Sequence, residues 1–234
     1  MRLLDLFSRR YDGRAGDMMP PVPTSKASAV KRGATGGAVI ALILAGLIVR
    51  EGGYVDHPSD RGGKTKYGVT EAVARDFGYA GHMRDLPLDC GPGRPICAKG
   101  IYTTRYIDAP GYRPLASIEP AVLDELVDSA VLHGPPRASR WFQQALNDLD
   151  GAGLAVDGNV GARTVAAYQQ YQARAGRTLA CRMTLDRMDA AQSAFFDAIV
   201  RSNPSQRVFL RGWKAHRIGN VDRRKCVDYF GRMV

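Results

Sequence analysis

Residues 51–70 read EGGYVDHPSDRGGKTKYGVT, and this stretch divides an apolar segment from a Gly-rich one. Before it, residues 33–49 (GATGGAVIALILAGLIV) carry no charge. Gly52 and Gly53 supply the backbone conformations that end helices, so the apolar segment is predicted to be a helix that ends at Glu51. Residues 52–70 hold too many Gly and turn residues for a helix, and they predict a small β-hairpin or looped sheet.

A carboxyl group at the end of an apolar helix is suited to donating a proton. Glu51 is expected beside the negative end of the helix dipole and next to apolar surface, and both effects raise the pKa of a carboxyl group. A carboxylic acid that stays protonated near neutral pH is the donor that a glycosidic oxygen needs. Asp60 lies nine residues later, where it can stabilise oxocarbenium charge or orient a water, and the Thr65 hydroxyl can hold that water. The spacing alone is equally compatible with Glu51, Asp60 and Thr65 being ordinary surface residues.

The same stretch resembles the signature of glycoside hydrolase family 108, the phage and prophage muramidases, in which Glu-Gly-Gly-Tyr precedes Asp-x-Gly-Gly-x-Thr-x-x-Gly-Ile-Thr. The matching residues are Glu51, Gly52, Gly53, Tyr54, Asp60, Gly62, Gly63, Thr65, Gly68 and Thr70, with Val69 in place of Ile. The resemblance implies that Glu51 is the catalytic residue. We expect Tyr54, Tyr67 and Thr70 to bind substrate. The Glu–Asp spacing is also similar to that of the T-even phage lysozymes, whose triad is Glu, Asp and Thr. The Asp-to-Thr interval is one residue shorter here, and Lys66 occupies the nearest alternative position.

A second resemblance lies in the C-terminal half. Residues 155–165 (AVDGNVGARTV) resemble the Asp-Gly-x-x-Gly-x-x-Thr loop of predicted peptidoglycan-binding modules. Turn and capping geometry explains each residue of this loop better than sugar contact does. Arg187 and the stretch 209–213 are similar to the end of the module that accompanies family 108 domains. His133 is expected at a helix end, and Trp141 and Phe142 are expected to fill the core rather than stack on sugar.

Helical spacing of apolar residues predominates after residue 118. One helix is predicted from about 120, and the others over 71–78, 136–148, 161–174, 178–201 and 205–217. Residues 79–100 are expected to be a loop rich in Pro and Gly. The predicted fold class is mainly α and, by the resemblance, lysozyme-like, with a small β element next to the catalytic helix. We expect 50–117 to be the catalytic region and 118–234 a peptidoglycan-binding-like region of the same globular body.

The four cysteines are either buried apolar side chains or, as we predict, two disulfides. Asn203-Pro204 is a turn signal for an antiparallel helical pair, and Cys181 and Cys226 lie equidistant from it. Cys90 and Cys97 flank a short loop that a local bridge can close. Two disulfides indicate an oxidising compartment. The cysteines match no zinc pattern and the histidines are scattered, so neither a metal nor a cofactor is expected.

The N-terminal residues predict a temporary membrane attachment. Residues 1–32 are expected to be a poorly ordered basic tail on the cytoplasmic side. Residues 33–49 fit a cleaved signal peptide poorly, because no suitable cleavage region follows; a buried core helix and a membrane anchor remain, and we favour the anchor. A permanent anchor would hold Glu51 at the membrane. The segment resembles the signal-anchor-release segments of certain phage endolysins, which implies an inactive form in the host inner membrane and an active form released to the periplasm.

These features together predict a monomeric phage endolysin. It would hydrolyse the β-1,4 bond between N-acetylmuramic acid and N-acetylglucosamine in peptidoglycan and lyse the host. The formal net charge of +10 attracts any polyanion, but no recognised nucleic-acid-binding motif is present, so we expect no nucleic-acid partner. The alternatives are a non-catalytic, membrane-anchored peptidoglycan-binding protein, a muramidase that serves protein secretion, and a basic nucleic-acid binder.

Overall fold

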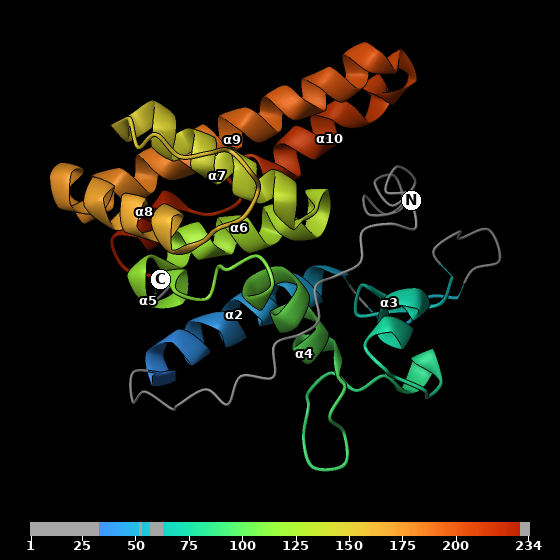
Figure 1. The fold of residues 1–234 in the computed structure, drawn as a ribbon. Coiled ribbons are helices and arrows are strands. Elements are labelled where there is room, and N and C mark those ends of the chain that lie inside the picture. The colour runs from blue at the N-terminus through green and yellow to red at the C-terminus, as the bar shows by residue number, and fades with distance from the viewer. Residues whose placement is uncertain (1–32, 52, 57–62, 230–234) are drawn as a thin grey trace. The chain divides into compact units, whose positions relative to one another are not determined.

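A computed structural model describes residues 33–51, 53–56 and 63–229, and the side chains of 33–35 and 49–51 are outside this description. The predicted tail, residues 1–32, lies outside the described residues. The chain divides into two compact units, residues 1–101 and 102–234 (Figure 1).

The first described element of the first unit is α2 (Gly33–Glu51), the apolar helix predicted from the sequence. Two adjacent residues are buried at every fourth position along the helix. These pairs are Val39 and Ile40, Ile43 and Leu44, and Leu47 and Ile48. Leu42, between two such pairs, is 52% exposed. This spacing gives the helix one buried face, which is typical of a helix that contributes to a core. Within the described residues, no helix is long and apolar enough to cross a membrane.

A short hairpin and small helices come after α2. Strands β1 (Thr65–Lys66) and β2 (Val69–Thr70) form the two-stranded sheet, and α3 (Glu71–Asp76) starts directly after it. The predicted helix 71–78 ends two residues early, because Gly78 has a φ of +85° that a helix cannot continue through. The expected loop 79–100 contains the 3-10 helix η2 (Met83–Asp85) and the start of α4 (Ala98–Thr103). Within it, Cys90 and Cys97 form the predicted disulfide.

The second unit is a helical bundle. Its elements are the π-helix η3 (Thr104–Asp108), α5 (Leu115–Ile118), α6 (Pro120–His133), α7 (Pro135–Asp150), α8 (Ala162–Ala175), α9 (Arg177–Ser202), η4 (Pro204–Gln206), α10 (Arg207–Arg217) and η5 (Arg223–Cys226). The long helices lie within two residues of their predicted bounds. Helix α6 is buried along almost its whole length, and α7 and α9 pack on it. Helices α9 and α10 form the predicted antiparallel pair, which turns at Asn203 (Figure 1).

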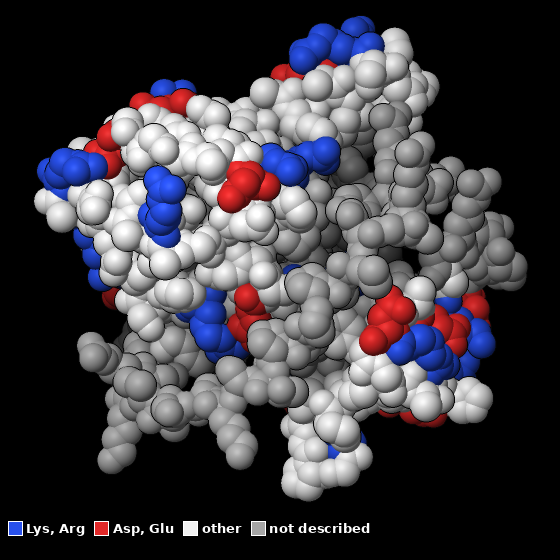
Figure 2. Space-filling view, in the orientation of Figure 1, with Lys and Arg blue, Asp and Glu red and all other residues white. Residues whose placement is uncertain are grey.

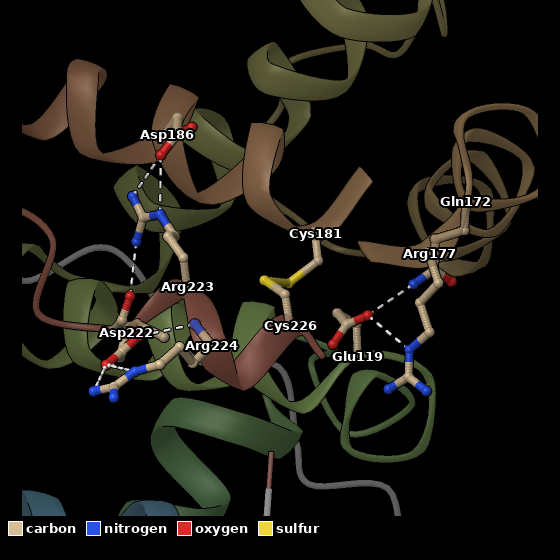
Figure 3. Close-up of a disulfide and its surroundings, with 10 residues drawn as sticks. Glu119, Gln172, Arg177, Cys181, Asp186, Asp222, Arg223, Arg224 and Cys226 are labelled. Atoms are coloured by element: carbon tan, nitrogen blue, oxygen red, sulfur yellow. Dashed lines mark hydrogen bonds and ion pairs between the residues drawn. A yellow bond between two sulfur atoms is a disulfide. The ribbon is translucent and has the colours of Figure 1, made fainter. Parts of the chain in front are cut away.

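Residues 217–229, which we call the C-terminal strap, are tied to the bundle by a disulfide and by ion pairs. Cys226 forms the predicted bridge with Cys181 of α9 (Figure 3). The polar contacts between the strap and the bundle include Arg217 Nη1 to Asp128 Oδ1 (2.9 Å), Asn220 Nδ2 to Asp128 Oδ2 (2.8 Å), Arg223 Nε to Asp186 Oδ1 (2.9 Å), Arg223 to Asp189, the Gly219 amide to Asp189 Oδ2 (3.0 Å), and Lys225 Nζ to Asp124 Oδ2 (2.7 Å). Asp124, Asp128 and Asp189 are buried, so the strap supplies the donors that these carboxylates need.

Glu125 lies among these carboxylates but receives no basic partner from the strap. Its side chain is fully buried, and its Oε1 accepts a hydrogen bond of 3.0 Å from Ser129 Oγ. Burial raises the pKa of Glu125 well above its ordinary value, and the charges of Asp189 and Asp128 raise it further. Glu125 is therefore a neutral carboxylic acid in the folded protein over a range of pH in which it is ionised in the unfolded chain.

Replacing Glu125 with Gln is expected to stabilise the protein more at pH 8 than at pH 4. A carboxyl whose pKa is raised by folding holds its proton longer in the native state, so the free energy of unfolding falls as pH rises above the unfolded pKa. Between the pKa of Glu125 in the unfolded chain and its pKa in the folded protein, the free energy of unfolding falls by at most about 1.4 kcal/mol for each pH unit. Gln keeps an acceptor for Ser129 and does not titrate, so this loss disappears. Urea unfolding at several pH values measures the difference. An equal effect of E125Q at both pH values would contradict the expectation.

Candidate active site

The candidate site is built around the hairpin that comes after α2. Val55 and Thr65 form an antiparallel bridge, with hydrogen bonds of 2.8 and 2.9 Å between their amides and carbonyls. Thr65 then pairs with Thr70, which leaves Tyr67 and Gly68 as a two-residue turn. Both turn residues have positive φ, +53° and +78°, as the tightest hairpin turns require. The bridge brings the chain just after α2 next to the strand that carries Thr65.

The three predicted catalytic residues differ in how far the structure describes them. Glu51 is the last residue of α2, as expected, but its side chain lies outside the described residues. Asp60 lies within 57–62, also outside the described residues. Thr65 is in β1, and its hydroxyl donates to the Gly63 carbonyl at 3.3 Å. That bond uses the hydroxyl proton of Thr65, so the oxygen still can accept a hydrogen bond from a water.

The predicted substrate-binding residues already make contacts within the first unit. Tyr54 Oη donates to Asp56 Oδ2 at 3.0 Å, and the Arg84 guanidinium lies 5.0 Å from the centroid of the Tyr54 ring. Thr70 caps α3, because its hydroxyl accepts a 3.4 Å hydrogen bond from the Val73 amide. The role of Thr70 in substrate binding stays a prediction beside this structural role.

Tyr67 and Lys66 lie on opposite sides of the boundary between strand and turn. The Lys66 ammonium is 5.1 Å from the centroid of the Tyr67 ring and donates to the Arg84 carbonyl. The Lys66 side chain thus ties the hairpin to η2, whereas the Thr65 hydroxyl donates to a carbonyl only two residues earlier in the chain. Arg84, which contacts Tyr54 and Lys66, was not predicted. It is 30 residues from Tyr54, and no local pattern in the sequence reports such a contact.

The loop at residues 155–161 has the structural role expected from the sequence. Asp157 Oδ1 accepts hydrogen bonds from Gln143 Nε2 (2.7 Å) and from the Asn159 amide (2.9 Å), and these bonds hold the pKa of Asp157 below its ordinary value. The Gly158 amide donates to Gln143 Oε1 at 2.9 Å, and Gly158 has a φ of +90°. Turn geometry and contacts to α7 therefore account for these residues, as predicted.

Charge on the described residues is mixed. Over α3, Lys and Arg side chains lie beside Asp and Glu, while a basic group gathers at the free end of the α9–α10 pair (Figure 2). Ion pairs such as Arg113–Asp108 and Arg174–Asp150 compensate part of the positive charge locally. Within the described part of the chain, no three His, Cys, Asp or Glu side chains gather in a way that could hold a metal ion.

Two family models match consecutive parts of the chain. Residues 44–134 match the model described as Glycosyl hydrolase 108, and residues 137–218 match the Predicted Peptidoglycan domain. The chain therefore contains a glycosyl hydrolase 108 domain followed by a predicted peptidoglycan domain. The family 108 match contains the α2–hairpin region with Glu51 and Thr65, and the second match contains the loop at 155–161. With these two domains, the protein is a lysozyme-type glycoside hydrolase, a muramidase whose substrate is peptidoglycan.

A solved structure shows the same fold. The structure of Brucella abortus SagA is similar to this chain with a TM-score of 0.58 and 24% identity, over 84% of this chain and 98% of SagA. No curated protein sequence matches the chain. The predicted fold class, mainly α and lysozyme-like with a small β element, is confirmed. The predicted boundary between residues 117 and 118 stays a prediction. The first family match ends at residue 134 and the second begins at residue 137, whereas the two compact units divide between residues 101 and 102.

Proposed function

We propose that this muramidase is a phage endolysin, which cleaves the β-1,4 bond between N-acetylmuramic acid and N-acetylglucosamine and thereby lyses the host cell. The observation that carries the proposal is the arrangement at the end of α2. The helix runs to Glu51 within the residues matched to family 108, and the chain then returns through the Val55–Thr65 bridge. A carboxyl group at the end of an apolar helix is suited to donate a proton to a glycosidic oxygen.

In this proposal the three residues have distinct roles. Glu51 donates its proton to the leaving oxygen of N-acetylglucosamine. Asp60, ionised, stabilises the positive charge that develops on the ring of N-acetylmuramic acid, or positions the attacking water. Thr65 assists by accepting a hydrogen bond from that water, since its own proton is donated to Gly63. This chemistry uses carboxyl groups and water and no cofactor.

Mass spectrometry of digested peptidoglycan tests the reaction. Purified sacculi are incubated with the protein, and the new ends are reduced with borohydride. A muramidase produces reduced N-acetylmuramic acid at every new end, whereas a glucosaminidase produces reduced N-acetylglucosamine and an amidase releases free peptides. Reduced N-acetylmuramic acid is expected. Intact sacculi after prolonged incubation would favour the non-catalytic wall-binding alternative and contradict the proposal.

We further propose that the protein is first tethered to the host inner membrane through residues 33–49, with its N-terminus in the cytoplasm, and is then released to the periplasm as a monomer. Residues 33–49 are uncharged, but eight of them are Gly or Ala, so their insertion is weakly favourable. Support for the released form comes from α2, whose buried face includes Val39, Ile43 and Leu47. These residues cannot be in lipid and in the protein core at once, so activity would come only after release.

The glycines of α2 allow a direct test of release. Gly37 and Gly46 are exposed, and a Cβ at either position would meet no atom within 4 Å, so Leu fits at both sites in the folded enzyme. Gly36 is buried and is left unchanged. The variant G37L/G46L is expected to keep the activity of purified protein on isolated peptidoglycan, to remain in the membrane fraction and to delay lysis, because each Leu favours insertion.

The matched control is G37Q/G46Q, which fills the same space without added hydrophobicity. Its release is expected to be no slower than that of the wild type. Collapse of the membrane potential is expected to hasten release of the wild type. If G37L/G46L lysed cells on the wild-type schedule, or if wild-type protein never reached a soluble periplasmic fraction, the release model would be wrong. The muramidase assignment does not depend on it.

A further inference from the structure

Two neighbouring aromatic residues of α7 occupy different environments. Phe142 is fully buried, with its ring 5.6 Å from that of Tyr168. Trp141 is only half-buried. The sequence predicted that both would fill the core, and the prediction is wrong for Trp141. A single partly exposed Trp is ordinary, but a partly exposed Trp next to a second partly exposed aromatic ring can form a contact surface.

Trp141 belongs to an aromatic surface built by three helices of the second unit. Phe195 of α9 is also half-buried, and its ring centroid lies 5.9 Å from that of Trp141. Beneath them His133, at the end of α6, meets both rings edge-on, at 5.1 Å and 5.2 Å. His133 is buried and contacts Gln192 Nε2 at 3.0 Å. Burial lowers the pKa of His133 to about 3, so it is a neutral support for the two rings at physiological pH.

A basic side chain borders this surface. Arg137 is exposed and lies one helical turn before Trp141 on α7. Its guanidinium is 4.1 Å from the centroid of the Phe195 ring, which fixes the position of the charge relative to the aromatic surface. The surface therefore presents the partly exposed Trp141 ring and, beside it, the Arg137 cation that lies over Phe195.

We propose that Trp141, Phe195 and Arg137 form a binding site for the glycan strand of peptidoglycan. A pyranose ring offers an apolar face of C–H groups to the exposed part of the Trp141 ring. The carboxylates of the stem peptide, or the lactyl carboxylate of N-acetylmuramic acid where no peptide is attached, offer anions to Arg137. All three residues lie within 137–218, the part matched to the Predicted Peptidoglycan domain. The proposal rests on peptidoglycan as the substrate, and it does not require the catalytic roles assigned to Glu51, Asp60 and Thr65.

Tryptophan fluorescence tests the site, because the chain contains only two Trp residues and Trp213 is 1% exposed. In the variant W213F, Trp141 is the only reporter. The probes are a tetrasaccharide of alternating N-acetylglucosamine and N-acetylmuramic acid, and chitotetraose, which lacks the carboxylates. Both are expected to shift the Trp141 emission, and the acidic tetrasaccharide is expected to bind more tightly.

Substitutions then separate stacking from charge. In the W213F background, R137Q is expected to weaken binding of the acidic tetrasaccharide about tenfold and to leave chitotetraose binding unchanged. The matched control is R163Q, an exposed arginine of α8, which is expected to have no effect. In the otherwise wild-type chain, W141L is expected to reduce binding to intact sacculi about tenfold and to raise KM without changing kcat. The conservative variant W141F is expected to recover most of the binding.

The outcomes distinguish this site from the enzymatic proposal. A shift in Trp141 emission in a protein that cuts no glycan would support the site and contradict the muramidase mechanism. Normal cleavage with no shift in Trp141 emission at millimolar tetrasaccharide would overturn the site alone. Equal effects of R137Q and R163Q, a stronger response to single-stranded DNA than to either sugar, or self-association that W141L abolishes would also overturn it.

Discussion

Glu51→Gln is expected to fold normally and to lose activity on peptidoglycan by a factor of about 10²–10⁴ or more, the range over which a general acid contributes. Gln has the size and shape of the protonated carboxyl but cannot transfer the proton that the leaving sugar oxygen needs. Because Glu51 is the last residue of α2, the exchange also leaves the buried residues of the helix unchanged. Loss of turbidity of a sacculus suspension measures the activity, and circular dichroism and thermal unfolding verify the fold.

Two further substitutions and one control complete this test. Asp60→Asn is expected to be severely impaired and Thr65→Ala less so, because the Thr65 hydroxyl assists the water rather than bearing charge. The control is Glu71→Gln, a carboxyl of the first turn of α3 that pairs with Arg75 at 2.7 Å on the surface. It is expected to keep nearly full activity, since exposed ion pairs contribute little to stability. If the Glu51→Gln variant lysed cells as fast as the wild type does, the mechanism assigned here would be wrong.

The sequence predicted most of the helical architecture, because periodic burial and terminal signals are local. The bounds of α7, α8, α9 and α10 differ from prediction by at most two residues, and Gly78 accounts for the early end of α3. Both disulfides are confirmed, since each depended on a turn that the sequence marks with Pro or Gly.

Contacts between distant residues were beyond the reach of such local signals. Arg84 contacts Tyr54, which lies 30 residues earlier in the sequence. The strap binds carboxylates on α6 and α9 that are about 30 to 100 residues away in the sequence. The positive φ of Tyr67 was also not predicted, because Gly68 alone marks the turn. Trp141 and Phe142 are consecutive helical residues, so their side chains point about 100° apart around the helix. This rotation buries Phe142 and leaves Trp141 partly exposed. The residue types alone do not predict which of the two faces the core.

Removing the disulfide between Cys181 and Cys226 is expected to destabilise the protein more than removing the one between Cys90 and Cys97. A crosslink restricts the unfolded chain, and the restriction grows with the loop that it closes. The separations are 45 and 7 residues. Chain entropy then gives about 4 kcal/mol for the first bridge and about 2.4 kcal/mol for the second. The variants are C181S/C226S and C90S/C97S, and urea unfolding under identical conditions measures both.

The contacts of the strap determine how the protein responds to loss of the longer bridge. With Cys181 and Cys226 reduced, residues 217–229 are held by ion pairs to Asp124, Asp128 and Asp189, and their release would leave three carboxylates of the bundle without these basic partners. An uncompensated buried charge is strongly destabilising, so the strap is expected to stay bound until the bundle itself unfolds, in one transition. The wild type in dithiothreitol should therefore unfold cooperatively and at lower urea than the oxidised protein. If C90S/C97S were the less stable variant, or if the strap of C181S/C226S became protease-sensitive while the bundle stayed folded, the bridge and the ion pairs would not act together as the structure indicates.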